Sequence, residues 1–386
     1  MLDVKHGAAH VGDGAGIDFD FATITDYPSF KSLEGEWNEL HATSPRSYLS
    51  QTFQWCDVAF QTVAQPSGAS LFCLTARSRG RLILVWPWVI YRRGLLRHAE
   101  QLGCGFFERQ VILVADDPGV AHLVSEAWQQ LSDTMPADVL VVRRVHSDSR
   151  LAACLKDERG VRAVEEESHP TIEWDQYASW SDYITRRNKE ETKSKRRHQH
   201  RRRLEAVGEI SFGVLEDPDK FEEAIEWLWR HKRIWMTRAG LQNPWIERVA
   251  FRNFLSAMKS RPSPAGSLTL FFLRVDGKPI AGALAAVDKS WISPFISTFD
   301  EEWSKYSAGR ILLESLLEWG YEHNLAYDLG AGDEPYKKHY LSSENCLATY
   351  ILSRSIWGGL YFVMRTWQNR LVAAVNFGAH LKHAKP

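Results

Sequence analysis

The sequence predicts a mixed α/β protein made of two domains that repeat one order of strands and helices. The chain has 386 residues, which is too long for one ordinary hydrophobic core. Its residues are 44% hydrophobic and 25% charged, as in folded globular proteins. Strand-like alternation and helix-like spacing of apolar residues occur in both halves. We therefore expect each domain to have a mainly antiparallel mixed sheet flanked by helices.

The first half begins with a strand, two helices and two strands, and continues with strand, helix, strand. Ser78-Arg79-Gly80 separates two apolar stretches and is typical of a hairpin turn. The expected strands are at 17–25, 69–76, 81–91, 111–115 and 138–145, and the expected helices are at 28–41, 52–63 and 119–132.

The second half repeats a similar order after a long basic helix. Ser179 and Asp182 form an S-x-x-D capping signature at the start of that helix, and Gly208 is expected to end it in a left-handed conformation. Asp217-Pro218 predicts the start of the next helix, and Asp276-Gly277 a hairpin turn. The expected helices are at 180–207, 218–240 and 309–324, and the expected strands are at 210–214, 268–275, 280–287, 291–299, 325–329 and 347–353.

This repetition predicts two related domains, at 17–168 and at 169–354, the second including the basic helix. Residues 1–16 are expected to be disordered and residues 355–386 to form a helical tail. The apolar residues of the tail are interrupted by arginines and an asparagine, so the tail is not expected to span a bilayer. Packing onto the domain is favoured over an interfacial membrane helix.

The composition and the chain start exclude several classes of protein. The first residues lack the apolar segment of a secretory signal, and no stretch is long enough for a transmembrane helix, so we expect a cytoplasmic protein, free or peripheral at the inner face of the cell membrane. The formal net charge is −1, so an anionic partner needs a local basic patch. We expect no metal site, and free buried thiols are favoured over a catalytic thiol at Cys56, Cys73, Cys104, Cys154 and Cys346.

A small-residue loop before the helix at 309–324 is the first candidate for a ligand site. Tyr306-Ser307-Ala308-Gly309-Arg310 precedes the helix, whose first N–H groups and positive dipole end can hold a phosphate. Gly309 lets a pyrophosphate approach the backbone, and Arg310 can pair with it through two hydrogen bonds. The alternative is an ordinary helix with Ser307 as its cap.

A glycine-rich turn after the strand at 325–329 is the second candidate. The run DLGAGDEPYKKHY brings carboxylates, tyrosines, lysines and a histidine to the carboxyl end of one strand, where α/β proteins gather ligand-binding groups. Group transfer to an amine or hydroxyl needs a base and an acid, for which Asp or Glu and Tyr are suited. The candidate catalytic residues are Asp328, Asp333, Glu334, Tyr336 and Lys337. The alternative is a surface turn with solvated charges.

The basic helix carries the densest charge in the chain. Ten Lys and Arg residues stand between Arg186 and Arg203 against two glutamates. Arg196, Arg197 and Arg201 are our candidates for binding a phosphate-bearing substrate, a tRNA or an anionic membrane surface, and the alternative is a solvated helix. No aromatic residues are interleaved, which argues against single-stranded nucleic acid. On the next helix, Trp235 is a candidate wall of a sugar-binding cleft.

Two runs, FDEEWSKYSAGRILLESLLEWGYE and YDLGAGDEPYKKHY, resemble the C-terminal signature of the GNAT-superfamily acyltransferases called CelD-like or BioF2-like, which are associated with cellulose and exopolysaccharide biosynthesis and related to the FemAB peptidyltransferases. This resemblance extends over residues 17–353 through three further segments, LSQTFQWCDVAF, LVWPWVIYRRG and SWSDYITRRNKEETKSKRRHQHRRRLEAVGEISF. The loop at residues 306–310, called the donor loop because the corresponding loop of GNAT enzymes binds the acyl donor, differs from the usual GNAT pattern in that it keeps one glycine, Gly309.

The resemblance implies tandem GNAT-like domains and an acyl-CoA donor, acetyl-CoA or another, for N- or O-acylation of a sugar or polysaccharide precursor of the cell envelope. Carried over to this sequence, Tyr306, Ser307, Gly309 and Arg310 would bind the donor. The candidate catalytic residues of the glycine-rich turn would line the reaction centre. Two alternatives remain open: aminoacyl transfer from tRNA, as in the FemAB proteins, and a non-catalytic scaffold of a polysaccharide-synthesis complex.

Overall fold

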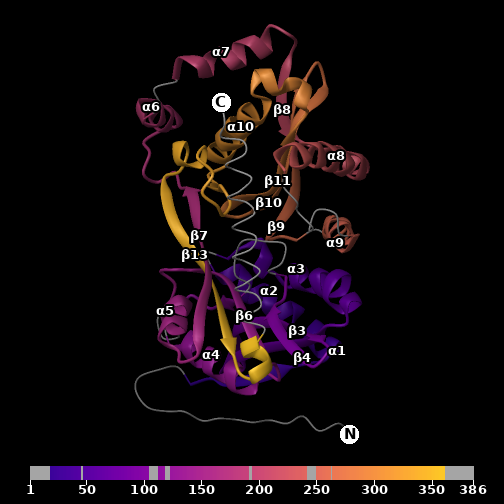
Figure 1. The fold of residues 1–386 in the computed structure, drawn as a ribbon, viewed down its shortest axis with the longest axis vertical. Coiled ribbons are helices and arrows are strands. Elements are labelled where there is room, and N and C mark those ends of the chain that lie inside the picture. The colour runs from indigo at the N-terminus through magenta and orange to yellow at the C-terminus, as the bar shows by residue number, and fades with distance from the viewer. Residues whose placement is uncertain are drawn as a thin grey trace. The chain divides into compact units, whose positions relative to one another are not determined.

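The computed structural model divides the chain into two compact units (Figure 1). Unit 1 contains the chain up to Glu166 and the chain from Cys346 onward, and unit 2 runs from Glu167 to Asn345. The structure describes residues 18–44, 47–103, 112–117, 122–190, 194–240, 249–261 and 263–360, without the side chains of 188–190, 194–199 and 239. The predicted disordered start, Cys104 and the tail beyond residue 360 lie outside the described residues.

The sheet of unit 1 has the strand order β1-β2-β3-β4-β6-β13, with the short β5 paired to β3. Neighbouring strands are antiparallel except β4 and β6, which are parallel. The strands are β1 (Asp20–Ile24), β2 (Ser70–Ser78), β3 (Arg81–Arg93), β4 (Leu96–Gln101), β5 (Leu113–Val114), β6 (Val139–His146) and β13 (Ser343–Ser353).

The helices of unit 1 are shorter than the sequence pattern predicts. They are α1 (Tyr27–Ser32), α2 (Glu34–Thr43), α3 (Phe53–Ala59), α4 (Leu123–Thr134) and α5 (Arg150–Asp157). The predicted helix 28–41 is two helices that meet at Leu33, and α3 continues into a wider π-turn over Phe60–Ala64. The core includes the buried rings of Trp86, Trp88 and Trp128, because large aromatic side chains supply much buried apolar area.

The sheet of unit 2 repeats the pairing pattern of unit 1. Its order is β8-β9-β10-β11-β12-β7, and all neighbours are antiparallel except β11 and β12, which are parallel. The strands are β7 (Val161–Ile172), β8 (Ile210–Val214), β9 (Gly266–Val275), β10 (Lys278–Asp288), β11 (Trp291–Phe299) and β12 (Ala326–Asp328). Each unit thus has four antiparallel strands, one parallel step and a last antiparallel strand, as the prediction of two related mixed sheets requires.

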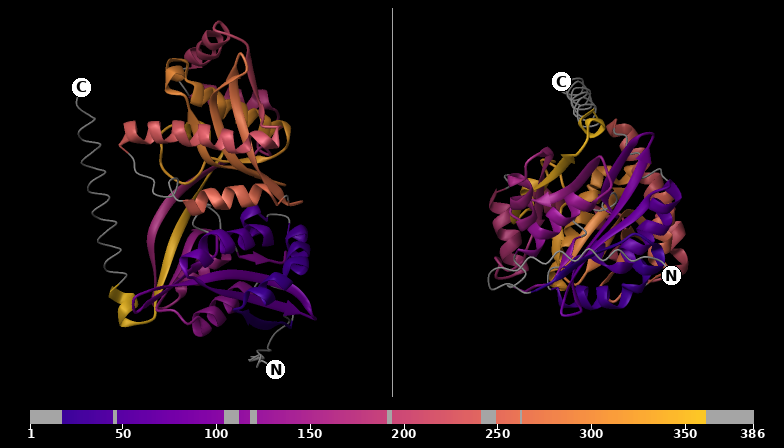
Figure 2. Two further views of the ribbon diagram at one scale, coloured as in Figure 1. Left: turned by 90° about the vertical axis from the view of Figure 1, so that its right-hand side faces the viewer. Right: turned by 90° about the horizontal axis from the view of Figure 1, so that it is seen from below.

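Helices cover both faces of the unit 2 sheet (Figure 1, Figure 2). They are α6 (Trp180–Glu190), α7 (Ser194–Glu205), α8 (Phe221–Ala239), α9 (Val249–Lys259) and α10 (Ala308–Glu322). A Cβ built on Gly282 of β10 would lie 3.0 Å from Leu228 of α8, so α8 covers that face. A Cβ on Gly309 of α10 would lie 2.9 Å from the Phe299 ring, so α10 packs closely on β11. The alternation of side chains along a strand places α8 and α10 on opposite faces.

The expected basic helix 180–207 is described as two helices, α6 and α7. Its predicted cap is present: the Asp182 N–H donates to Ser179 Oγ at 3.1 Å, and Asp182 Oδ2 accepts from the Ala178 N–H at 3.1 Å. Gly208, however, is not left-handed. Its missing side chain makes room for the Asp276 carboxylate, which accepts from the Glu209 N–H at 2.8 Å.

The last strand, β13, departs from the predicted domain division. Residues 347–353 were expected in the second domain, but Leu347 to Ser353 pair with β6 of unit 1. Conversely, Thr171 and Ile172 of β7, which follow β6 and α5 in the chain, pair with β12 of unit 2. The chain therefore passes from unit 1 to unit 2 within β7 and returns within β13.

Candidate functional site

The edge of β11 that faces away from β10 is the starting point of the candidate site. On that side β11 pairs with β12 at Trp291 and Ile292 and with no described strand further along. Asp300 donates its N–H to Ile280 of β10 at 2.8 Å. Because antiparallel pairing alternates, the N–H and C=O of Ser297 point away from β10, to the edge that β12 leaves open.

The N-terminus of α10 lies at the end of the same strand. A 3₁₀ turn, Glu301–Tyr306, connects β11 to Ser307, which adopts a left-handed conformation with φ 59°. The N–H groups of Arg310 and Ile311 donate to the Ser307 carbonyl. This arrangement leaves the N–H groups of Ala308 and Gly309 without an acceptor among the described residues, as at a helix N-terminus that can bind an anion.

The predicted donor residues are brought together here, with two differences from the expected roles. Ser307 makes no side-chain cap; its Oγ lies 3.5 Å from Nδ1 of His200 on α7. Arg310 Nε donates to Glu314 Oε1 at 3.3 Å, one turn further along α10. Glycine is required at position 309 because a side chain there would collide with the Phe299 ring. The Tyr306 ring packs on Trp303 with ring centroids 5.6 Å apart.

The basic helix therefore reaches the donor loop, which the sequence did not indicate. Leu204 is fully buried in the core on the α10 side of the sheet and fixes the position of α7. Next to it, Arg201, Arg202 and Arg203 are exposed, and Arg201 pairs with Glu205 at 3.3 Å. The side chains of Arg196 and Arg197 lie outside the described residues. Positive charge thus lies on the helix that contacts Ser307.

Asp328, the first residue of the glycine-rich turn, is a buried structural carboxylate in this structure. It is 2% exposed, and its Oδ1 lies 2.8 Å from Nε2 of the buried His169 on β7. The same oxygen accepts from the Gly330 N–H at 2.8 Å, and Oδ2 accepts from Ser293 Oγ at 3.5 Å. These contacts hold the start of the turn against β7 and β11.

Lys337 ties the same turn together from its far end. Its side chain is 5% exposed, and Nζ donates to the carbonyl oxygens of Gly330 and Ala331 at 2.9 and 2.8 Å. Nζ also pairs with Glu334 Oε2 at 2.8 Å. All three donors of the ammonium therefore have partners within the turn, which indicates that Lys337 shapes the turn rather than meeting a substrate.

The remaining predicted catalytic residues are accessible. Asp333 and Glu334 are exposed, and the Tyr336 side chain is 48% exposed. Neighbouring Tyr327 is buried, and that burial raises the pKa of its phenol well above the ordinary value. Among the tyrosines of this strand and turn, Tyr336 is thus exposed, whereas Tyr327 and Tyr340 are buried.

Trp235 lies on the side of α8 that approaches the open edge of β11. Its ring receives the ammonium of Lys232, 4.2 Å from the ring centroid, and Lys232 Nζ donates to the Ser297 carbonyl oxygen at 3.2 Å. The structure thus places the tryptophan that was predicted to line a sugar-binding cleft near β11, the strand that precedes the predicted donor residues. Lys232 was missed by the sequence analysis because a lone lysine on an amphipathic helix resembles any solvated residue.

A second group that the sequence analysis missed links α6, α10 and the chain after the turn. Arg187 on α6 is buried, and its Nη2 donates to Glu314 Oε1 at 3.3 Å. The Tyr340 hydroxyl donates to the same oxygen at 3.3 Å, and the Arg187 guanidinium lies 4.8 Å from the Tyr340 ring centroid. Since Arg310 also pairs with Glu314, this cluster fixes the first turns of α10.

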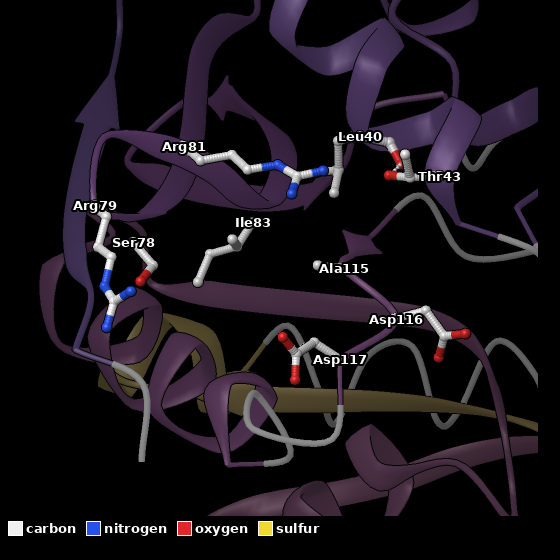
Figure 3. Close-up of a pocket in the computed structure, with 9 residues that line it drawn as sticks. All are labelled: Leu40, Thr43, Ser78, Arg79, Arg81, Ile83, Ala115, Asp116 and Asp117. Carbon is white, nitrogen blue, oxygen red and sulfur yellow. Dashed lines mark hydrogen bonds between the residues drawn. The ribbon is translucent and has the colours of Figure 1, made fainter.

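A separate pocket of about 600 Å³ lies in unit 1 (Figure 3). Figure 3 shows Arg79 and Arg81 on one side and Asp116 and Asp117 on the other, with Ile83 between them. The four charged residues are exposed, and no predicted site residue lines the pocket. Within the described residues, no cluster of side chains could hold a metal ion, and no helix is long and apolar enough to cross a membrane.

Comparison with a family model decides the type of the second unit. Residues 193–338 match the model of the acetyltransferase (GNAT) domain. Unit 2 contains a GNAT-type domain. The match includes α7, the donor loop and the glycine-rich turn up to Lys338, and it covers less than half of the chain. No curated protein matches the sequence.

Three solved structures are similar to this chain over most of its length. FemX is 10% identical over 86% of this chain and 97% of its own, with a TM-score of 0.57. A conserved protein of unknown function from Bacteroides thetaiotaomicron is 13% identical over 82% of this chain and 96% of its own, with a TM-score of 0.50. A tandem GNAT protein from the clavulanic acid biosynthesis pathway is 12% identical over 88% and 99%, with a TM-score of 0.46.

The sheet order, the family model and the likeness to FemX confirm the predicted mixed α/β fold with GNAT-type architecture. At such low identities the likeness concerns the fold, because one fold supports many activities. The CelD-like or BioF2-like subfamily, the substrates and the roles of individual residues stay predictions.

Proposed function

We propose that this protein is an acyl-CoA-dependent N- or O-acyltransferase, most simply an acetyltransferase, that modifies a sugar or polysaccharide precursor of the cell envelope. The observation that carries the proposal is that an open strand edge and an uncapped helix N-terminus lie next to each other in the GNAT-type domain. The open edge of β11 is followed, after the 3₁₀ turn Glu301–Tyr306, by the uncapped N-terminus of α10, where the N–H groups of Ala308 and Gly309 have no acceptor in the described chain.

The donor side of this site follows from elementary electrostatics. Free N–H groups and the positive end of a helix favour a pyrophosphate, and the exposed arginines of α7, the helix whose His200 contacts Ser307, add positive charge. The extended polar arm of an acyl-CoA donor can pair with an unpaired strand edge, as an added strand does. The outward N–H and C=O of Ser297 supply such an edge.

The acceptor side lies where α8 and the glycine-rich turn approach that edge. The acceptor's nitrogen or oxygen attacks the acyl carbon while a base takes its proton, and the carbon–sulfur bond breaks. The leaving thiolate takes a proton from an acid, for which Tyr336 is suited by its exposure. Trp235 supplies an apolar wall of the kind that sugar rings pack against.

Ser307 allows a matched test of the donor site. Asp and Asn both tolerate the left-handed backbone of Ser307 and differ in charge alone. We expect Ser307→Asp to weaken acetyl-CoA binding by about tenfold or more, because a carboxylate within about 5 Å of a phosphate costs on the order of 1–3 kcal/mol at a partly exposed site. Isothermal titration calorimetry with acetyl-CoA measures the dissociation constant of each variant.

Ser307→Asn is the control and should bind acetyl-CoA within about threefold of the wild type. The thermal stability of Ser307→Asp should not fall, since a negative charge favours a helix N-terminus. Equal affinity of the two variants would remove α10 from the donor site. No binding by the wild type would instead favour a non-catalytic scaffold.

Aminoacyl transfer from tRNA is the second candidate function. The observation that favours it is the exposure of Arg201, Arg202 and Arg203 on the helix that contacts the donor loop. Binding of an aminoacyl-tRNA that competes with acetyl-CoA, and is lost on changing these arginines to glutamine, would support this alternative.

A further inference from the structure

Lys232 occupies an unusual place in the GNAT-type domain. Its Nζ lies 3.2 Å from the Ser297 carbonyl oxygen, one of the groups that point to the open edge of β11. Its other close neighbour is the Trp235 ring, 4.2 Å from Nζ to the centroid. An ammonium has three donors, and one of them has an acceptor among the described residues.

The surroundings of Lys232 favour its neutral form more than water does. Burial of the side chain lowers its pKa, and the carboxylate of Glu334, from the turn after β12, acts in the opposite direction. On α8 itself, His231 is partly buried and the pKa of its ring is lowered by that burial. Arg238 is paired with Glu301 at 2.6 Å. Glu334 is thus the acidic group that opposes the effect of burial on Lys232.

The Glu334 carboxylate is itself held in the turn, because Lys337 Nζ pairs with its Oε2 at 2.8 Å. For a partly buried amine such as Lys232, losing the proton relieves the cost of burial.

From this geometry we propose that Lys232 is the general base of the transfer reaction, with Glu334 controlling its protonation. The proposal rests on the acyl-CoA-dependent function above. Neutral Nζ takes a proton from the acceptor amine or hydroxyl as the new bond to the acyl carbon forms. The carbon–sulfur bond breaks, the thiolate leaves with the electron pair and takes up one proton, and Lys232 returns its proton to water. The products are the acylated acceptor and the free thiol.

Competitive labelling tests the protonation of Lys232 without an acceptor. The protein is treated with traces of acetic anhydride over a range of pH, and the modified peptides are quantified by mass spectrometry. We expect Lys232 to become reactive at lower pH than the exposed Lys289 of the same protein. Saturating acetyl-CoA should protect Lys232 and leave Lys289 unchanged.

The sign of the Glu334 effect gives a second check. Because the carboxylate raises the pKa of Lys232, Glu334→Gln should shift the labelling curve of Lys232 to still lower pH. A curve for Lys232 that coincides with that of Lys289, or one that Glu334→Gln moves upward, would overturn the proposal.

Kinetics separate a base from a fixed positive charge. Turnover is measured as thiol release from acetyl-CoA with glucosamine as the probe acceptor. Lys232→Arg keeps the charge but cannot lose its proton, so Lys232→Arg and Lys232→Met should both lower kcat by about 10² to 10⁴. Both should also lose the rise of kcat/KM with pH.

Retention of most activity by Lys232→Arg would show that the residue provides charge and would refute its role as base. Failure of the wild type to bind acetyl-CoA would refute the proposed function itself. The labelling curves distinguish that outcome from a failure of the inference, because they report on Lys232 whether or not a donor binds.

Discussion

Replacing Lys337 by methionine tests whether this residue holds the glycine-rich turn or takes part in the reaction. The substitution keeps an unbranched side chain and removes the ammonium. Its three hydrogen bonds, to Gly330, Ala331 and Glu334, are then lost. Hydrogen bonds that involve a charged group contribute about 1.5–3 kcal/mol each to the free energy of unfolding.

The expected loss is smaller than the sum of three such bonds. Gly330 and Ala331 are half-buried and Glu334 is exposed, so water replaces part of what the ammonium supplied. We therefore expect Lys337→Met to lower the free energy of unfolding by about 2–4 kcal/mol. Urea denaturation at 25 °C measures this as a midpoint lower by about 1–2 M. Hydrogen exchange read by mass spectrometry should show faster exchange in residues 326–345.

Lys338→Met is the matched control, because Lys338 is the next residue and is exposed. Its free energy of unfolding should change by no more than about 0.5 kcal/mol. If Lys337→Met is as stable as Lys338→Met and has lost its turnover, the structural role of Lys337 is wrong and the original assignment to the reaction centre is right.

Two further predictions concern the helices around the donor loop. Arg187→Met should lower the free energy of unfolding by about 2–4 kcal/mol, because it removes a buried partner of Glu314. The control is Arg186→Met, which should change the free energy of unfolding by about 0.5 kcal/mol or less, because Arg186 is exposed and pairs within its own helix. Equal denaturation midpoints of the two variants would contradict a structural role of Arg187. Changing Arg201, Arg202 and Arg203 together to glutamine should raise the KM of a phosphate-bearing acceptor and flatten the salt dependence of that KM, with no change in acetyl-CoA affinity. If the KM of variant and wild type responds to salt in parallel, these arginines do not contact the acceptor.

The local order of elements could be predicted because it depends on short stretches of sequence. Alternation of apolar residues located β9, β10 and β11 closely, and Asp276-Gly277 marked the turn between β9 and β10. The S-x-x-D signature found the cap of α6, and Gly240 ends α8 in a left-handed conformation. Strands β4 and β7 were missed because their polar residues hide the alternation on which such predictions depend.

Similar limits apply to the candidate site. The sequence alone located the donor loop and the glycine-rich turn, since each is a continuous run of small and polar residues. It named five polar residues of this run together as catalytic candidates: Asp328, Asp333, Glu334, Tyr336 and Lys337. Burial separates them: Asp328 and Lys337 have their partners inside the fold, whereas Asp333, Glu334 and Tyr336 are accessible. Whether a charged side chain is buried depends on distant residues such as His169, which lies 159 positions before Asp328.

By itself, then, the sequence determined the class of the fold, the repeated order of its elements and the two runs that mark the site, because propensity, caps and turns act over a few residues. The tertiary structure alone decided three matters that depend on residues far apart. It assigned β13 to unit 1 by pairing it with β6, it brought His200 of the basic helix to Ser307, and it placed Lys232 at the open edge of β11. Strand pairing and helix packing join segments by shape and hydrogen bonding across the chain, which local sequence patterns do not encode.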